Sequence, residues 1–223
     1  MKPTLILCAL ALFGLLTATP AQAGEYIGGN ISWTAPQDAD FEYKNFPLVI
    51  ESSYSDSVGF GLVFGKSYDN NLRIEGELGY RSNDLDSFSD EGESFAAGGD
   101  ISVFSFLFST YYDLANPSRF TPYFGAGLGG AYVNLDARLI DPALEDLVFS
   151  DEALALAYQL GGGIACQITR ELTLDLGYRY FSTANLKFKD QDNTLVDIDG
   201  NVLNSFETDY SAHNIALGLR LAF

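Results

Sequence analysis

The sequence has 223 residues, of which 47% are hydrophobic and 14% aromatic, and its formal net charge is −18. So acidic a balance argues against a nucleic-acid partner, and so apolar a composition argues against a disordered acidic chain. The charge must therefore be segregated from the apolar segments along the sequence.

Residues 1–23 have the pattern of a cleaved signal peptide. Lys2 supplies the positive n-region, an apolar stretch follows, and small residues lead up to a cleavage site expected after Ala23. Removing 23 of 223 residues leaves 200, which is enough for a single domain over residues 24–223. That domain keeps one cysteine, Cys166, so no internal disulfide is expected.

The remaining sequence predicts strands and no membrane helix. Nowhere does it offer the roughly 18 to 20 uninterrupted apolar residues that a spanning helix needs. Alternation of large apolar with small or polar residues has a period of two, which is typical of strands with two unlike faces. It predicts eight strands, near residues 25–34, 57–66, 71–82, 101–112, 121–134, 153–168, 172–186 and 209–223.

The connections between these strands alternate in length. Those after the second, fourth and sixth strands are short, whereas those after the first, third, fifth and seventh are long. The long ones hold 23 of the 30 acidic residues and are predicted to be loops: 35–56, 84–100, 136–152 and 190–209. This alternation predicts an up-and-down arrangement with turns on one side and acidic loops on the other.

One face of each strand is apolar and the other is polar or charged. Near 71–82, Leu72, Ile74 and Leu78 alternate with Arg73 and Glu75. A soluble β-sandwich would show the same alternation, with the charged face in water. Glycines on the polar face favour a closed barrel instead, because small residues make room for large side chains in a narrow interior: Gly59, Gly61, Gly65, Gly125, Gly127, Gly129, Gly161 and Gly163.

Aromatic residues on the apolar face gather near the strand ends. Such positions are typical of two girdles, where a barrel wall crosses the two interfaces of a membrane. The predicted girdle on the long-loop side is Trp33, Tyr80, Tyr132 and Tyr180, and that on the short-turn side is Phe64, Tyr112 and Phe124. The final strand ends on Phe223 without a polar tail, as expected if it closes the barrel against the first strand.

Three segments resemble a known family: "TPYFGAGLGGAYV" (121–133), "LTLDLGYRYF" (172–181) and "HNIALGLRLAF" (213–223). They are similar to the small outer-membrane β-barrels of Gram-negative bacteria, the opacity-protein-like and OmpA-transmembrane-domain-like group. The resemblance implies an all-β, eight-stranded antiparallel transmembrane barrel with short periplasmic turns and long extracellular loops. It also implies that Phe223 is part of the signal read by the barrel assembly machinery.

The resemblance further suggests partners and a location. It implies a cell outer membrane protein, monomeric, that contacts outer-membrane lipid and lipopolysaccharide, and the barrel assembly machinery during biogenesis. No nucleic acid, cofactor or metal is expected to bind, and any host or surface ligand is left unidentified.

Charged residues on the inward face predict a network inside the barrel. An eight-stranded lumen is about wide enough to be filled by its own side chains, and buried charges must be paired. The predicted network is Arg73, Glu75, Glu77, Arg81, Asp175, Arg179 and Arg220. The alternative is that these charges line the selectivity filter of a conducting pore.

The leading functional hypothesis is a non-enzymatic barrel that displays acidic extracellular loops for adhesion, antigenicity or envelope integrity. The alternative is a narrow channel for small or hydrophobic solutes that resembles the OmpW group. A remote alternative is a lipid A hydrolase using Ser211 and His213, although their order differs from the His-x-Ser of those enzymes. The stretch 190–201 is acidic but fails the EF-hand template, so weak divalent-cation binding there stays open.

Overall fold

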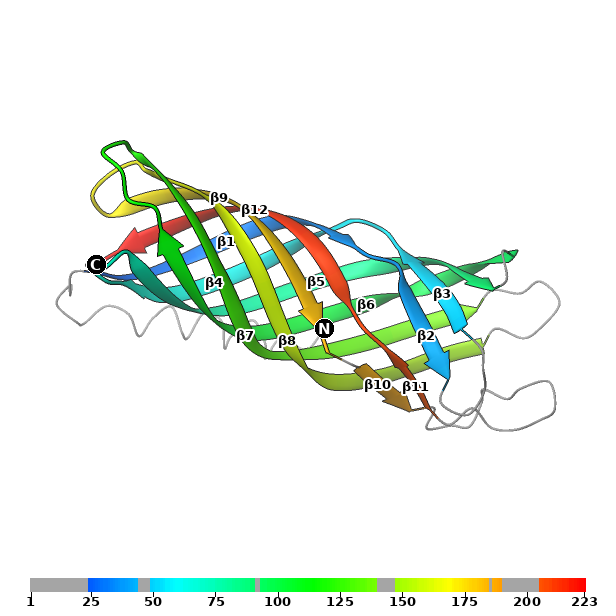
Figure 1. Ribbon diagram of the computed structural model, residues 1–223. Coiled ribbons are helices and arrows are strands. Elements are labelled where there is room, and N and C mark those ends of the chain that lie inside the picture. The colour runs from blue at the N-terminus through cyan, green and yellow to red at the C-terminus, as the bar shows by residue number, and fades with distance from the viewer. Residues whose placement is uncertain (1–23, 44–48, 91–92, 140–146, 185, 190–204) are drawn as a thin grey trace, which may run out of the picture.

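The computed structural model describes residues 24–223 except for 44–48, 91–92, 140–146, 185 and 190–204. Eight of its strands form a closed antiparallel barrel (Figure 1), which confirms the predicted fold: β1 (Glu25–Pro36), β4 (Ser57–Ser67), β5 (Leu72–Asp90), β6 (Glu93–Asp113), β7 (Phe120–Leu139), β8 (Leu147–Gln167), β9 (Leu172–Thr183) and β12 (Ser211–Ala222). The described part contains no helix long and apolar enough to cross a membrane.

The first and last strands close the barrel. β12 pairs with β1 from Ala222 opposite Tyr26 to Ala212 opposite Pro36. Beyond this ladder, the Phe223 amide donates to the Glu25 carbonyl at 3.0 Å. The chain therefore ends at the rim of the wall, and the barrel leaves no free edge along these two strands.

The predicted short turns lie together at one end of the barrel. They connect β4 to β5, β6 to β7 and β8 to β9 over residues 68–71, 114–119 and 168–171. The first turn is tight: the Tyr68 amide donates to the Leu72 carbonyl, and Asn71 adopts a positive φ of 65°. Asparagine tolerates this left-handed conformation better than most residues.

Four further strands extend the wall at the opposite end: β2 (Ala39–Tyr43), β3 (Val49–Tyr54), β10 (Leu186–Lys189) and β11 (Ser205–Thr208). They pair in the order β10, β11, β2, β3, β5, which repeats the order β9, β12, β1, β4, β5 of the barrel. We call this end of the molecule the distal section, and the part with the short turns the proximal section. The barrel thus continues as one long tube (Figure 1).

The prediction that the long connections are loops is wrong for most of their described residues. β2 and β3 lie within 35–56 and β11 lies within 190–209, while barrel strands run through 84–100 and 136–152. β5 runs on to Asp90 and β6 begins at Glu93, while β7 runs to Leu139 and β8 begins at Leu147. The loop prediction took polar residues as a sign of irregular structure. These strands are polar because the outward face changes character, whereas the alternation itself continues.

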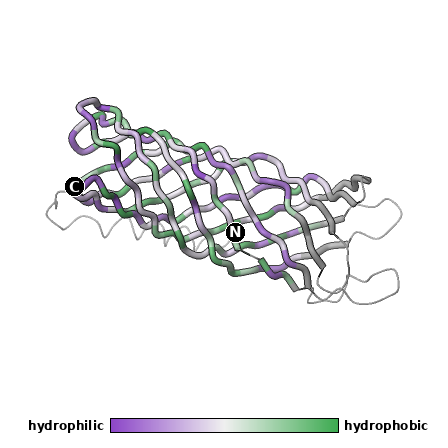
Figure 2. The backbone as a smooth tube through the Cα atoms, viewed as in Figure 1, coloured by the Kyte–Doolittle hydropathy of each residue, from purple (hydrophilic) through white to green (hydrophobic). Residues whose placement is uncertain are grey.

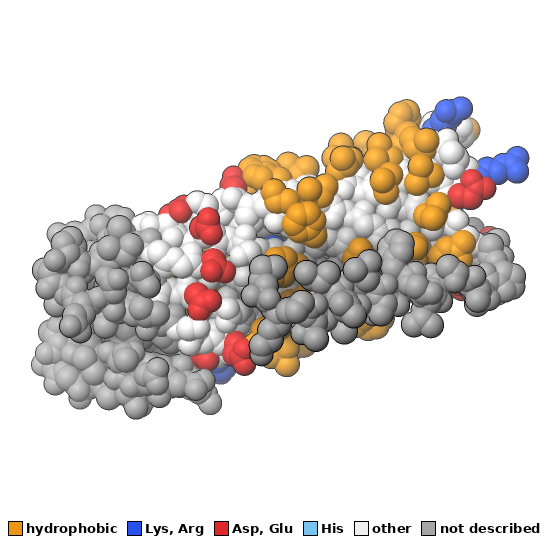
Figure 3. All heavy atoms as spheres, turned by 180° about the vertical axis from the view of Figure 1, so that it is seen from behind, with side chains coloured by type: hydrophobic (Ala, Val, Ile, Leu, Met, Phe, Trp, Pro, Cys, Tyr) orange, Lys and Arg blue, Asp and Glu red, His pale blue; other side chains and the backbone are white. Residues whose placement is uncertain are grey.

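The change of character is visible along single strands. On β5 the outward residues pass from Leu78 and Tyr80 to Ser82 and Asp84, while the inward residues pass from Arg81 to Leu85. An apolar exterior therefore gives way to a polar one, and a charged interior gives way to an apolar one. Figure 2 shows more hydrophobic residues in the proximal wall, and Figure 3 shows the apolar band ending at a row of acidic side chains.

The wall is interrupted between β8 and the strand beside it. β9 stops at Thr183, opposite Ala157, whereas β8 continues to Leu147. β10 lies next to β8 but forms no ladder with it, although the Ala184 amide still donates to the Leu156 carbonyl at 2.8 Å. Within the described strands, this side of β8 is the one place where the tube is not closed by paired strands.

Candidate functional site

The lumen of the proximal section brings the predicted charged residues together. Arg179 Nη1 lies 2.6 Å from Glu77 Oε1, and Arg220 Nη2 lies 3.0 Å from Asp175 Oδ2. The side chains of these two arginines are only 12% and 13% exposed. Pairs buried to this degree are screened weakly by water, so each partner depends strongly on the other.

Arg73 occupies the end of the lumen near the short turns. Its guanidinium pairs with Glu75 and, at 3.3 Å, with Asp113. It also lies 4.5 Å from the ring centre of Tyr111 and 4.9 Å from that of Tyr123. The aromatic faces and the two carboxylates together enclose this cation.

Neutral polar residues, which the pattern of charged residues did not predict, complete the network. The Tyr26 hydroxyl donates to Glu75 at 2.6 Å, and the Tyr123 hydroxyl donates to Asp175 at 2.5 Å. Gln159 Nε2 donates to Glu77 at 3.1 Å. Each of these residues lies on the inward face of its strand, so the alternation could have identified them had neutral polar residues been considered as well as charged ones.

The inward glycines make room for these tyrosines. A Cβ atom placed on Gly163 or on Gly177 would lie 2.6 Å from the Tyr123 hydroxyl oxygen, closer than such contacts allow. Gly65 faces the Tyr26 ring and Gly125 the Tyr111 ring in the same way. A larger residue at Gly65, Gly163 or Gly177 would displace the hydroxyls of Tyr26 and Tyr123 that bind the lumen carboxylates.

Arg81 differs from the other lumen cations. Its guanidinium lies 3.8 Å over the ring centre of Phe181, and its Nη1 atom has no hydrogen-bond partner. Arg179 Nε and Arg220 Nε are also without partners. Two cavities of about 20 Å³ lie among these side chains, each large enough for one water molecule. Within the described residues, side chains thus fill most of the proximal lumen.

An apolar cluster fills the distal lumen. Its members include Ile101, Val103, Val133, Leu135 and Phe188, all at most 2% exposed. This packing resembles the core of a water-soluble protein and places a dry layer beyond the charged network.

Two tyrosines, the buried Tyr210 and the partly buried Tyr54, belong to the same distal layer. Burial raises the pKa of Tyr54 to about 12 and that of Tyr210 to about 12. The Tyr210 hydroxyl donates to Asn83 Oδ1 at 2.9 Å, and the Tyr210 ring packs edge-on against Phe181. Both phenols are therefore held in the neutral form.

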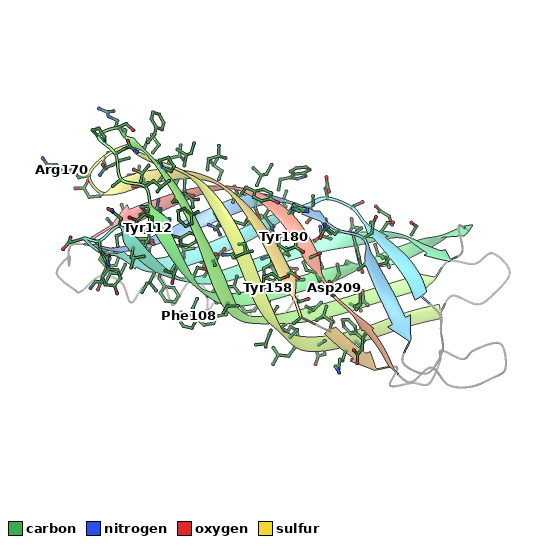
Figure 4. All side chains as sticks on the ribbon, viewed as in Figure 1. Phe108, Tyr112, Tyr158, Arg170, Tyr180 and Asp209 are labelled. Carbon is green, nitrogen blue, oxygen red and sulfur yellow. The ribbon has the colours of Figure 1, made fainter. Side chains whose placement is uncertain are left out.

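The predicted girdle residues all point away from the lumen. On the distal side, Trp33, Tyr80 and Tyr132 are 42–50% exposed, and Tyr180 packs beside Tyr158 (Figure 4). On the side of the short turns, the outward aromatic residues are Phe64, Tyr112 and Phe124, with Phe223 at the end of the wall. The role of Phe223 in barrel assembly stays a prediction.

A ring of carboxylates lies on the outer surface next to the distal girdle (Figure 3). We call it the acidic collar: Asp38, Asp56, Asp84, Asp86, Asp100, Asp136, Glu152 and Asp209. Three of its members, Asp84, Asp100 and Asp136, lie opposite one another on β5, β6 and β7. The collar marks where the wall leaves an apolar environment for water.

Ser211 and His213 do not form a pair. His213 Nδ1 lies 2.6 Å from the Tyr178 hydroxyl, and the Ser211 hydroxyl donates to Gln37 Oε1 at 2.8 Å. Cys166 is a free, partly buried residue on β8. Two predictions, the signal peptide at 1–23 and the acidic stretch 190–201, lie outside the described residues.

Comparison with known proteins agrees with this architecture. A family model described as "Outer membrane protein beta-barrel domain" matches residues 6–223. The chain belongs to this outer membrane β-barrel family. The distal section, which carries the long connections, is accordingly the extracellular end, and the short turns are periplasmic.

The individual proteins that match are only distantly similar to this chain in sequence. A "Putative adhesin RC1281" of Rickettsia conorii is 28% identical over 196 residues, covering 84% of this chain and 75% of that protein. The "Outer membrane protein PagN" of Salmonella typhimurium is 23% identical and covers 100% of both chains. The crystal structure of OprG from Pseudomonas aeruginosa has a TM-score of 0.56 at 14% identity, covering 91% of this chain and 98% of that one, and supports the fold alone.

Proposed function

We propose that this protein is a non-enzymatic surface adhesin whose binding surface is the distal section. The observation that carries the proposal is the extension of the barrel wall beyond the distal girdle as paired strands around an apolar core. A strand-built surface holds its side chains in fixed positions and loses less conformational entropy on binding than a flexible loop does. The name of the Rickettsia relative, a putative adhesin, agrees with this role.

The charge of the surface suggests the chemistry of the partner. The acidic collar and the net charge of −18 favour a basic partner surface. Attraction between exposed charges is screened within about 10 Å at 0.1 M salt. Adhesion by this surface should therefore weaken as the salt concentration rises.

The lumen supports a role in display rather than in transport. Ion pairs fill its proximal half and apolar side chains its distal half, and the described cavities are about 20 Å³ each. The separation of Ser211 from His213 gives no support to a serine–histidine hydrolase. Contacts of the outer wall with lipopolysaccharide and the monomeric state are part of the same proposal.

The test removes the distal tip of the β5–β6 hairpin while keeping the pairing of the membrane-spanning parts of both strands. Asp84 and Asp100 face each other across β5 and β6, so residues 85–99 can be replaced by an Asn-Gly turn. Bacteria displaying the full chain should adhere to extracellular-matrix proteins or cultured epithelial cells, and the shortened variant should lose most of this adhesion.

The control replaces the periplasmic connection 114–119 with a turn of equal length and should leave adhesion unchanged. Heat-modifiable migration in detergent and recovery in the outer-membrane fraction verify that each variant folds and is exported. Equal adhesion by the full and shortened chains, with both present at the surface, would exclude the distal section as the binding surface.

A narrow channel is the second candidate, and the interruption between β8 and β10 favours it. There Leu154 and Leu156 are 82% and 76% exposed on the outer face, while the small residues Ala153 and Ala155 face inward. A path for apolar solutes would have to pass through this side of the wall. Reproducible conductance steps or solute flux from the refolded protein in planar bilayers would favour the channel over the adhesin.

A further inference from the structure

Arg81 is a buried cation without an anionic partner in the described part of the chain. Arg73, Arg179 and Arg220 each pair with a carboxylate, whereas no ion pair is formed between Arg81 and a described residue. Arg81 is only 8% exposed. The ring of Phe181 offers its π face to the cation but provides no conventional acceptor for the N–H groups. A buried charge of this kind is costly unless an anion compensates it.

A cavity of about 20 Å³ lies beside this guanidinium. The polar residues that line it are Asn30, Ser32, Glu77, Tyr80, Arg81, Gln159, Arg179 and Asn214. Its volume holds one water molecule or one small ion.

The unsatisfied atoms around the cavity are donors. Arg81 Nη1 and Arg179 Nε are buried and lack an acceptor. The one carboxylate in the lining, Glu77, is already engaged through both oxygens, by Arg179 at 2.6 Å and by Gln159 at 3.1 Å. The site therefore requires an acceptor that the described side chains do not supply.

Charge distinguishes an ion from a water molecule in this position. Of the two guanidinium groups that line the cavity, that of Arg179 is paired with Glu77, whereas that of Arg81 has no ion-pair partner among the described residues, so the charge of Arg81 is uncompensated. A water molecule would accept hydrogen bonds from these donors but would leave the positive charge uncompensated. We propose that this cavity binds one monatomic monovalent anion of the size of chloride, which supplies the counter-charge that Arg81 lacks.

The second cavity provides an internal comparison. It is lined by three arginines, and each of them has an ion-pair partner: Arg220 pairs with Asp175, Arg73 with Glu75, and Arg179 with Glu77. Its volume is also about 20 Å³. Because its charges are already paired, this cavity should contain water and no anion.

Diffraction from crystals of the mature protein grown in bromide tests the assignment directly. We expect an anomalous peak in the cavity beside Arg81, in contact with Nη1, and none in the cavity beside Arg220. Density without anomalous signal beside Arg81 would identify water and overturn the proposal. Equal peaks in both cavities would show that the ion enters without regard to the charge imbalance, and would overturn it too.

Stability in different salts tests the same site in solution. Replacing chloride with methanesulfonate at equal ionic strength should destabilise the wild-type barrel, because the larger anion should fit the cavity less well. If chloride is present at 100 times its dissociation constant, its removal shifts the unfolding equilibrium about 100-fold. No difference between the two salts in the wild-type protein would contradict the proposal.

The Arg81→Met variant keeps the length of the side chain and removes its charge, so its stability should be the same in both salts. Arg119→Met, in an exposed periplasmic connection, is the matched control and should keep the wild-type chloride dependence. A chloride dependence in Arg81→Met equal to that of the wild type would overturn the proposal. If Arg81→Met does not fold, the bromide crystals and the wild-type salt comparison still decide the question.

Discussion

The proximal and distal sections of this barrel bury opposite kinds of side chain with the same strands. In the proximal section the wall turns leucines outward and encloses Arg179 with Glu77. In the distal section it turns Asp84 and Asp100 outward and encloses Ile101. Lipid surrounds the first section and water the second, so the solvent outside determines the outward residues. The inward residues show that a narrow lumen can be filled either by paired charges or by apolar packing.

The charged lumen and the apolar lumen lose stability for different reasons when one side chain is removed. Removing one member of a buried ion pair leaves an uncompensated charge, because the lumen offers few other partners. Removing an apolar side chain leaves a cavity, and the cost depends on how far its neighbours can relax. Substitutions in the two sections can therefore separate these effects.

The largest effect is expected in the proximal section. Arg220→Leu leaves Asp175 without its cation, which should cost about 3 to 5 kcal/mol of unfolding free energy. The measurement is the urea midpoint in lipid vesicles. Lys66→Leu, which breaks the exposed Lys66–Glu25 pair, is the control and should cost at most about 1 kcal/mol. An unchanged midpoint for Arg220→Leu together with raised ion permeability would indicate a wide aqueous lumen instead.

Two isoleucines, one inside the distal section and one on the lipid-facing surface, test whether the distal core is tightly packed. Ile101 is 2% exposed inside the distal section, whereas Ile215 is 48% exposed on the outer face of β12. Ile101→Ala should cost about 2 to 5 kcal/mol, because it opens a cavity in packed protein. Ile215→Ala should cost about 1 kcal/mol, since lipid can fill the space. Equal losses in the same urea titration would show that the distal core is packed no better than the lipid-facing surface.

Alkaline pH should loosen the distal section before the proximal one. Tyr54 and Tyr210 have pKa values raised to about 12 by burial, compared with about 10 in an unfolded chain. The folded state therefore favours the neutral phenols, so their contribution to stability is complete below pH 10 and is lost as the pH rises through 12. Hydrogen exchange should show opening around Tyr210 between these values. In Tyr210→Phe, which cannot ionise at this position, the opening should move to higher pH; exchange that stays the same from pH 9 to 12 would contradict the prediction.

The sequence predicted the parts of this structure that a single alternation rule governs. The eight strands, the short turns and the outward girdle all follow from a period of two with an apolar lipid face. The rule failed for 84–100, where Asp84 and Asp100 are polar outward residues on strands in water. The alternation continued there, but the outward residues were polar and the inward residues apolar. The polar composition was therefore taken as a sign of a loop, although it belongs to strands in water.

The lumen was predictable in its charges but not in its contacts. Arg220 and Asp175 lie on adjacent strands, yet their pairing depends on the barrel register, which alternation does not define. The Tyr26 and Gln159 contacts join strands far apart in sequence. Arg81 shows the same limit, because its lack of an ion-pair partner among the described residues becomes evident only when the positions of the other lumen carboxylates are known.

The smallest effect is expected at the acidic collar, where the two sections meet. Asp100 lies directly opposite Asp84 on one side and Asp136 on the other, and like charges facing each other across strands are destabilising. Asp100→Asn should therefore stabilise the barrel, by about 0.5 kcal/mol at low salt. Its amide oxygen can still accept the hydrogen bonds that Ser82 and Ser102 donate to Asp100 Oδ2. The gain should shrink as salt screens the repulsion, and Asp69→Asn, in the turn after β4, should give no comparable gain. A loss of stability in Asp100→Asn at every salt concentration would mean that this carboxylate is compensated, and that the collar is not a site of net repulsion where the wall passes from lipid into water.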